Sequence, residues 1–324
     1  IRIIQINAPT VDGVQRLQQQ GHTLTCPCQV VSINYEYLVT LNASYHQVCS
    51  SALVSSDWID YLNRIADSTE DNYDNRDYRT TASSKFHLLS SMCELSSRTV
   101  SNAVFEFGRR QLITSELLPL TVFVSQMNSI VELFQRTLPN DFLRWLRLVR
   151  NVTNVNQLIS GGYSNFAVVY EDDPDTGEKT PLLQSDGFRF VTSNGTEGKC
   201  LCSTNLTCRT DTSLFRYDDE HQPIGPFYNV PNFYTACYPI ESLLPSSLAC
   251  FYDDNPCFDI VNPIGDAQLY RNFSRLDSTR TVRFSSNATV NDLLEQLFID
   301  SWSTVSLYAS YFDHCQPLTC QYAI

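Results

Sequence analysis

The hydrophobic and polar positions divide the chain into three zones. Residues 1–50 look extended, because IRIIQI alternates imperfectly and VVSINYEYLVTL (30–41) is rich in the β-branched and aromatic residues of strands. Residues 51–160 show the spacing of helices, and residues 161–324 consist of short apolar runs separated by turn residues.

The helical zone begins after a serine pair. Trp58, Ile59, Leu62 and Ile65 follow helical spacing, and Ser55 or Ser56 can cap this helix. After the acidic break at 67–77, periodic stretches run over about 80–114 and again from about residue 131 to 149. Proline is tolerated in a first turn, so Pro119 and Pro139 are predicted to start helices.

The last zone reads as hairpins and loops with one late helix. NFAVVYE (165–171) and KTPLLQ (179–184) flank the turn signal DDPDTGE, which predicts a hairpin, and GFRFVTS (187–193) predicts a further strand. Thr289 and Asp292 form a capping box for a helix through Leu293, Leu294, Leu297, Phe298 and Trp302. STVSLYASYF (303–312) is then predicted to be a strand.

These patterns predict an α+β fold. The helical middle region packs against a disulfide-braced, strand- and loop-rich C-terminal half, and the N- and C-terminal strands are tied together. Without repeats or low-complexity linkers, the segments 1–50, 51–160 and 161–324 are expected to form one composite domain.

Composition narrows the class of protein. A hydrophobic fraction of 43% with 18% charged residues indicates a globular chain, and the net charge of −13 argues against a nucleic-acid partner. The longest apolar run, LLPLTVFV (117–124), is about half a membrane span. The chain starts at Ile1 without a signal peptide, so we expect a processed portion, and an anchor beyond either end stays open.

Cysteine usage indicates an oxidising compartment. The chain has twelve cysteines, and their C-P-C, C-L-C, C-x6-C and C-x4-C spacings differ from those of zinc sites. We therefore expect disulfides rather than a metal or free thiols. The cysteines are Cys26, Cys28, Cys49, Cys93, Cys200, Cys202, Cys208, Cys237, Cys250, Cys257, Cys315 and Cys320.

Six N-glycosylation sequons agree with this compartment, although a chain rich in Asn, Ser and Thr contains several by chance. The acceptors are Asn42, Asn151, Asn194, Asn205, Asn272 and Asn287. Beside the cysteines, they predict an extracellular glycoprotein that is secreted or shed from the cell surface, with N-linked glycans and no cofactor.

Catalytic signatures are sparse. The chain has no G-x-S-x-G elbow, phosphate loop, G-x-G-x-x-G or H-E-x-x-H motif, and no enzymatic activity is expected. DPDTGE (173–178) resembles part of a calcium loop but is interpreted as a hairpin turn. LRWLRLVR (143–150) offers Arg144, Arg147 and Arg150 for acidic glycans, but a solvated arginine face over a core of Leu143, Leu146 and Val149 is favoured.

Three stretches carry a family resemblance. LTCPCQVVSINYEYLVTLNASYHQVCSS (24–51), SDWI (56–59) and HCQPLTCQY (314–322) resemble uncharacterised cysteine-rich extracellular regions of membrane-anchored proteins abundant in bdelloid rotifers. In that family a membrane helix precedes the TCPC segment, and the last cysteine pair can be followed by another. The resemblance implies an exported body whose two ends lie near its point of anchorage or cleavage.

With this topology in view, Cys26 and Cys28 are expected to bridge to Cys315 and Cys320, in either order. Such bridges tie the two terminal strands together. Cys49–Cys93 and Cys250–Cys257 are expected next, which leaves the other four cysteines for two more bridges, although spacing alone does not settle the connectivity.

Two function hypotheses follow. The first is a non-catalytic structural glycoprotein that self-assembles into a fibril or matrix of its own copies, head to tail. The second is the ligand-binding ectodomain of a receptor or channel-like membrane protein. An exported hydrolase carries less weight because its motifs are missing.

The apolar strand in the first ten residues suggests how the copies would join in a fibril. An apolar strand at a chain end aggregates unless it is paired, so Ile1, Ile3, Ile4 and Ile6 are expected to find a partner strand. Pairing within the chain is the plain option. For a fibrous form, the prediction is that they complete a sheet of the neighbouring subunit as a donor strand.

Overall fold

The computed structural model describes residues 2–68, 74–156, 166–172, 179–185, 187–191, 197–202, 205, 207–220, 222–262, 273–280 and 283–324. The chain divides into two compact units, each assembled from separate segments. Unit 1 contains Ile1–Ser44, Ser97–Phe142 and Ser301–Ile324, and unit 2 contains Tyr45–Ser96 and Leu143–Asp300. Helices α3 (Tyr78–Gly108) and α4 (Leu120–Val155) supply residues to both.

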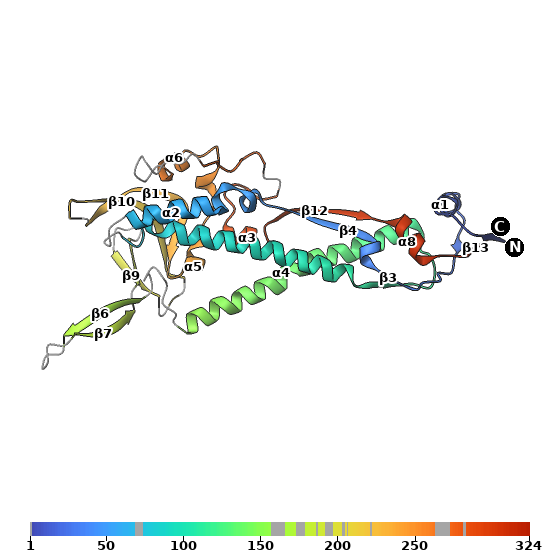
Figure 1. Ribbon diagram of the computed structural model, residues 1–324, viewed down its shortest axis with the longest axis horizontal. Helices are drawn as coiled ribbons and strands as arrows, with labels where there is room; N and C mark the ends of the chain where they lie inside the picture. The colour runs from blue at the N-terminus through green and yellow to red at the C-terminus, as the bar shows by residue number, and fades with distance from the viewer. Residues whose placement is uncertain are drawn as a thin grey trace. The chain divides into compact units, whose positions relative to one another are not determined.

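Unit 1 is built around short antiparallel pairings (Figure 1). Strand β13 lies between β1 and β2, β3 pairs with β5, and β4 pairs with β12. Helix α1 follows β1, and α8 precedes β13. The bounds are β1 Ile3–Asn7, α1 Val11–Gln19, β2 Leu24–Thr25, β3 Ser32–Asn34, η1 Tyr35–Tyr37, β4 Val39–Tyr45, β5 Gln111–Ile113, β12 Ile299–Ser306, α8 Tyr308–Cys315 and β13 Thr319–Ala323.

Two apolar clusters form the core of unit 1. In the first, the rings of Phe123 and Tyr311 stack at 4.7 Å between centroids, beside both terminal disulfides. In the second, Phe107 and Phe134 pack at 4.7 Å against residues of β4. The core therefore joins α4 to the strands from both ends of the chain.

Unit 2 contains the remaining elements. Its strands pair as the hairpins β6–β7, β8–β9 and β10–β11. The bounds are η2 Gln47–Ser50, η3 Ala52–Val54, α2 Ser56–Ser68, β6 Phe166–Asp172, β7 Lys179–Ser185, β8 Gly187–Val191, β9 Glu197–Leu201, β10 Arg209–Tyr217, β11 Pro223–Ala236, α5 Pro239–Leu243, η4 Ala249–Phe251, α6 Cys257–Val261 and α7 Val290–Leu294.

Aromatic side chains fill the core of unit 2. Phe86 of α3 meets Phe251 edge to face at 5.0 Å and stacks on Phe233 of β11 at 6.2 Å. Trp58 of α2, which is fully buried, packs edge to face on Phe86 and stacks on Phe258. These contacts pack the helical middle region against the disulfide-braced C-terminal half, as the predicted α+β class requires.

Several local predictions are confirmed. Ser55 Oγ accepts from the Trp58 N–H as the cap of α2, and α4 begins directly after Pro119. The β6–β7 hairpin and strand β8 lie where the turn residues and apolar runs predicted them. The Thr289–Asp292 capping box is present at the start of α7.

Three local predictions are wrong. Pro139 lies inside α4 rather than at a helix start. Helix α7 ends at Leu294 and does not continue through Leu297 and Phe298, whose φ of 53° and 56° lie outside the right-handed helical region. Trp302, also expected in this helix, lies in β12. The expected strand 303–312 is divided between β12 and α8. In α8, Tyr308, Tyr311, Phe312 and Cys315 are buried at helical spacing.

Candidate functional site

The two ends of the chain meet in the terminal sheet β1–β13–β2 (Figure 1). Cys26, directly after β2, bridges to Cys320 in β13, and Cys28 bridges to Cys315 at the end of α8. These bridges join residues 294 and 287 positions apart. The pairing expected of these four cysteines is confirmed, and so is the tie between the N- and C-terminal strands.

Strand β1 uses only one of its two edges within the described residues. Arg2 and Ile324 exchange backbone hydrogen bonds of 3.1 and 2.9 Å, and the register continues with Ile4 opposite Tyr322 and Ile6 opposite Cys320. Because hydrogen-bonding direction alternates along an antiparallel strand, the backbone groups of Ile3, Gln5 and Asn7 point away from β13. They form an open sheet edge.

The side chains of β1 follow the same alternation. Ile4 and Ile6 are half-buried, and Ile6 packs on the core of unit 1, whereas Ile3 is 67% exposed. Ile1 lies outside the described residues. Charged residues and prolines usually prevent further strand pairing at a sheet edge. The strand IIQIN has neither. It is paired within its own chain and keeps a free edge for another strand.

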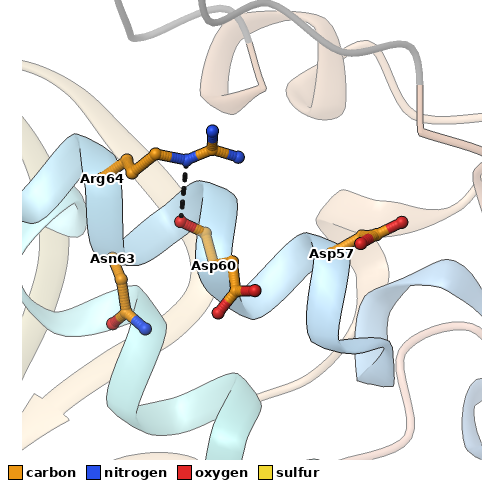
Figure 2. A pocket seen from close by; sticks show the side chains of 4 residues that line it. All are labelled: Asp57, Asp60, Asn63 and Arg64. Atoms are coloured by element: carbon orange, nitrogen blue, oxygen red, sulfur yellow. Dashed lines mark hydrogen bonds between the residues drawn. The ribbon is translucent and has the colours of Figure 1, made fainter.

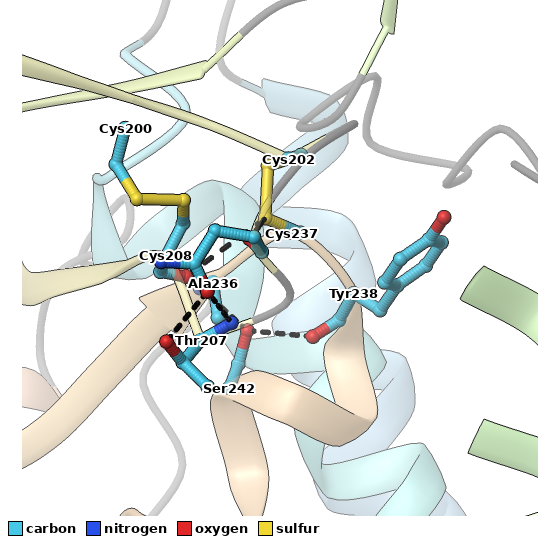
Figure 3. The surroundings of a disulfide bond; sticks show 9 residues. Cys200, Cys202, Thr207, Cys208, Ala236, Cys237, Tyr238 and Ser242 are labelled. Carbon is cyan, nitrogen blue, oxygen red and sulfur yellow. Dashed lines mark hydrogen bonds between the residues drawn. A yellow bond between two sulfur atoms is a disulfide. The ribbon is translucent and has the colours of Figure 1, made fainter. Parts of the chain in front are cut away.

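The remaining cysteines pair within unit 2. Cys49–Cys93 joins η2 to α3, and Cys250–Cys257 closes a local loop, as expected. Cys200–Cys208 and Cys202–Cys237 staple β9 to the β10–β11 hairpin, and Figure 3 shows the two bridges side by side. The latter four cysteines thus form two neighbouring staples rather than a metal site.

The sequon acceptors lie on the surface where they are described. Asn42, Asn151, Asn205 and Asn287 are exposed, so a glycan can be accommodated at each. Asn205 Oδ1 accepts hydrogen bonds from the N–H and hydroxyl of Thr207 in its own sequon, at 2.9 and 2.7 Å. Asn194 and Asn272 lie outside the described residues, as does the DPDTGE turn.

The described surface includes two hollows with polar linings. One, of about 480 Å³, lies beside α2 and is lined by Asp57, Asp60, Asn63 and Arg64 (Figure 2). Arg64 Nε donates to the Asp60 carbonyl at 3.3 Å, and the described residues include no group of three metal-ligating side chains. The hollow is therefore a polar depression with two carboxylates.

The second hollow, of about 450 Å³, lies between α1 and the start of α4 in unit 1. Gln15, Gln18, Gln19 and His22 contribute its polar groups. The Leu120 N–H donates to Gln18 Oε1 at 3.4 Å, and His22 packs on Tyr322. Uncharged amides over an apolar floor can bind a neutral polar ligand.

Unit 2 buries a charged network at the start of α3. The Asp77 carboxylate is fully buried and accepts from Arg79 Nε and Nη2 at 2.9 and 2.7 Å, and from the Phe215 N–H at 3.1 Å. Burial, then the charge of Asp77, raises the pKa of the Tyr217 hydroxyl. This network ties α3 to β10 and is satisfied internally.

Lys85, two turns further along α3, is buried without a carboxylate contact among the described residues. Its ammonium nitrogen lies 3.1, 2.9 and 3.1 Å from the hydroxyls of Thr81, Thr212 and Thr235, and 4.6 Å from the centre of the Phe233 ring. Burial lowers the pKa of Lys85 well below its usual value. Its place on the apolar row Ala82, Phe86 and Leu89 was the sequence signal that was missed.

His46 and Tyr252 form a second buried polar pair in unit 2. The Val48 N–H donates to His46 Nδ1 at 3.3 Å, so Nδ1 is unprotonated, and Nε2 lies 3.2 Å from the Tyr252 hydroxyl. Burial lowers the pKa of His46 to about 4, and burial raises the pKa of Tyr252 to about 12.

The predicted arginine face of α4 is arranged differently from expectation. Arg150 forms a bidentate ion pair with Glu241, with both hydrogen bonds at 2.6 Å, while Arg144 and Arg147 are exposed. Val149, expected in a core seam, is 57% exposed, and Trp145 is 63% exposed. The favoured interpretation of a solvated arginine face therefore holds for Arg144 and Arg147 but is wrong for Val149, which was expected in the core. The exposed side of this segment carries both arginines and apolar residues.

The described surface thus offers a sheet edge, exposed glycan acceptors, two shallow hollows and an apolar helix face. No helix among the described residues is both long and apolar enough to cross a membrane. The twelve paired cysteines indicate an oxidising, extracellular-type environment. Comparison with known proteins finds no matching family model, curated protein or solved structure.

Proposed function

We propose that this chain is the extracellular, non-catalytic body of a receptor or channel-like membrane protein, which acts by binding. The observation that carries the proposal is the terminal sheet, in which residues 2 and 324 exchange hydrogen bonds. A body held at a single base needs its first and last strands at one place. The family resemblance in the two cysteine-rich ends implies the same topology.

The two terminal bridges support this role mechanically. A force or fluctuation at either chain end reaches β1 and β13 first, and Cys26–Cys320 and Cys28–Cys315 prevent these strands from separating. In the loop-entropy relation, closing nearly three hundred residues stabilises the fold by about 6 kcal/mol. Such disulfides persist in the oxidising environment outside the cell, whereas the cytosol keeps thiols reduced.

Fractionation of native tissue tests the proposal. An antibody to this chain should find it in the membrane pellet, resistant to high salt and carbonate and released by detergent. Digestion with a glycosidase should lower its apparent mass if the exposed sequons are occupied. Recovery in salt-soluble or detergent-insoluble fibrous material would contradict the tethered form.

A self-assembling structural glycoprotein, secreted as a fibril or matrix, is the second candidate. The open, uncharged edge of β1 favours it, because such an edge is suited to strand addition. A donor-strand exchange would first have to remove β1 from β13, whereas addition at the outer edge keeps that pairing. Negative-stain microscopy of native material separates dispersed particles from fibrils.

A further inference from the structure

Three glutamine side chains share one face of helix α1. Gln18 and Gln19 lie three and four residues after Gln15, which places the three side chains next to one another on a helix. All three line the hollow of about 450 Å³ in unit 1, opposite the start of α4. One wall of this hollow is therefore a row of neutral amides, each of which can both donate and accept hydrogen bonds.

Gln18 joins the two walls of the hollow. Its Oε1 accepts from the Leu120 N–H at 3.4 Å, and its amide also interacts with the hydroxyl of Tyr308. That hydroxyl donates to the Leu118 carbonyl at 3.0 Å, and Tyr308 is only 6% exposed. Since the Gln18 amide meets a buried ring and the first residue of α4, it fixes α1 against the start of that helix.

Other polar groups of the hollow have no hydrogen-bond partner in the part of the chain that the structure describes. Gln15 is half-buried, and its amide is one of these groups, together with the side chains of Gln19 and Thr23. The Thr121 N–H, in the first turn of α4, has no intrahelical acceptor. These groups are available to a ligand that brings its own donors and acceptors.

The floor of the hollow is apolar, and its lining carries no carboxylate, ammonium or guanidinium. Leu24 and Leu120 pack from the floor onto the core of unit 1, and the ring of His22 packs on Tyr322 at 4.7 Å. None of the ten described lining residues is Asp, Glu, Lys or Arg. An ionised ligand would lose hydration here without gaining a counter-ion, and a purely apolar ligand would leave the amides unpaired.

We propose that this hollow binds an uncharged sugar residue of a glycan. A pyranose ring has an apolar C–H face that suits the leucine floor, and its hydroxyls both donate and accept, as the amides and Thr23 do. A peptide fits less well, because strand addition needs a free sheet edge and the bordering strand β2 has only two residues. The sugar site rests on the proposed binding role and names the ligand class for it.

Saturation-transfer NMR of the full chain, with its own N-glycans removed enzymatically, tests the site. The probes are methyl glucoside, galactoside and mannoside. Each is compared with the uronide of the same ring, which carries a carboxylate in place of the hydroxymethyl group. Saturable binding of at least one neutral probe is expected, at least tenfold tighter than that of its uronide. Absence of binding by all three, or equal binding of the uronide, would overturn the proposal.

Substitutions on α1 locate the binding. Gln15→Leu removes an amide at nearly constant size and should weaken sugar binding about tenfold, because a sugar hydroxyl is left unpaired. Gln19→Leu, at an exposed position, should weaken it without disturbing the fold. Gln20→Leu, at the end of the same helix but outside the hollow, should leave binding unchanged. Thermal unfolding checks the three variants. Binding that survives both Gln15→Leu and Gln19→Leu, or that Gln20→Leu weakens equally, would overturn the site.

A neutral peptide is the rival occupant of the hollow. A peptide of Gly, Ser and Gln that binds in a Gln15-dependent manner, while no glycoside binds, would assign the hollow to peptides and overturn the sugar site. The tethered body is tested separately, because the NMR measurement uses the isolated chain. A chain that binds glycosides through Gln15 but is recovered from tissue as salt-soluble material would support the sugar site and contradict only the tethered form.

Discussion

His46 is an imidazole that the fold keeps neutral. It is 1% exposed, and its Nδ1 accepts a backbone hydrogen bond that an imidazolium could not accept. Its pKa is about 4 in the folded chain, against an ordinary value of about 6.5 in the unfolded chain. Between these values the unfolded chain binds more protons, so stability falls as the pH falls.

This difference predicts a specific acid sensitivity. The stability present above pH 6.5 should be lost progressively down to about pH 4, by about 3 kcal/mol. His46→Gln should flatten this part of the profile, whereas His87→Gln, at an exposed histidine, should not. Urea unfolding at pH 7.5 and 4.5 measures the difference. Equal acid sensitivity in both variants would contradict the role of His46.

Lys85 gives a pH dependence of the same sign as His46, but in a more alkaline window. Its folded pKa is lowered by burial, so the unfolded chain again binds more protons, here between the folded pKa and the usual value near 10.5. Stability is expected to rise with pH across that window. Lys85→Met should remove the rise, since Thr212 and Thr235 hydrogen-bond to each other at 2.7 Å without the amine. Lys179→Met, on the exposed β7, is the matched control, and thermal unfolding from pH 7 to 10 is the measurement.

At the scale of elements, alternate residues of β1 point their backbone groups in opposite directions. The even-numbered residues hydrogen-bond to β13 within the fold, and the odd-numbered residues face the free edge, where a further strand could add. The Gln5 N–H lies on the free edge, while the Ile4 N–H faces β13. Gln5→Pro should therefore leave the melting temperature nearly unchanged and abolish any edge-to-edge assembly, because proline removes only an outward donor. Ile4→Pro should destabilise the terminal sheet. Light scattering and thermal unfolding report the two effects, and assembly that survives Gln5→Pro would exclude this edge.

Some boundaries between helices and strands could not be predicted from the hydrophobic pattern alone. The stretch 303–312 is apolar at both even and odd positions, so strand and helix periods fit about equally well. The helix α8 is selected by contacts with Phe123 and by the Tyr308 and Tyr311 hydroxyls, which bond backbone groups between residues 116 and 118. Those partners lie about 190 residues away, beyond any local window.

At the scale of the molecule, the two terminal bridges should not act additively. With Cys26–Cys320 intact, Cys28–Cys315 closes only a small ring, so removing either bridge alone is expected to cost about 2 to 3 kcal/mol. Removing both should cost about 8 kcal/mol, because the large loop also opens. A double-mutant cycle of Cys→Ser pairs, followed by guanidinium unfolding, measures the coupling. Additive losses would mean that the terminal sheet holds without the bridges.

The sequence by itself determined the class of fold, the helices around Trp58 and after Pro119, the β6–β7 hairpin and the Thr289–Asp292 cap. These depend on periodicity, turn chemistry and hydrogen bonds between near neighbours. The C-P-C pair also required distant partners, since Cys26 and Cys28 cannot bridge each other. With the family resemblance, this was enough to expect the C-terminal cysteines.

Only the tertiary structure decided which surfaces stay open. Whether Trp145 is core or surface depends on what packs over α4, and whether β1 has a free edge depends on the strand order β1–β13–β2. The burial of the Lys85 amine likewise depends on hydroxyls from β10 and β11, which lie more than a hundred residues away in the sequence. The burial of a side chain depends on contacts with residues from the whole chain, so a local sequence pattern cannot predict it.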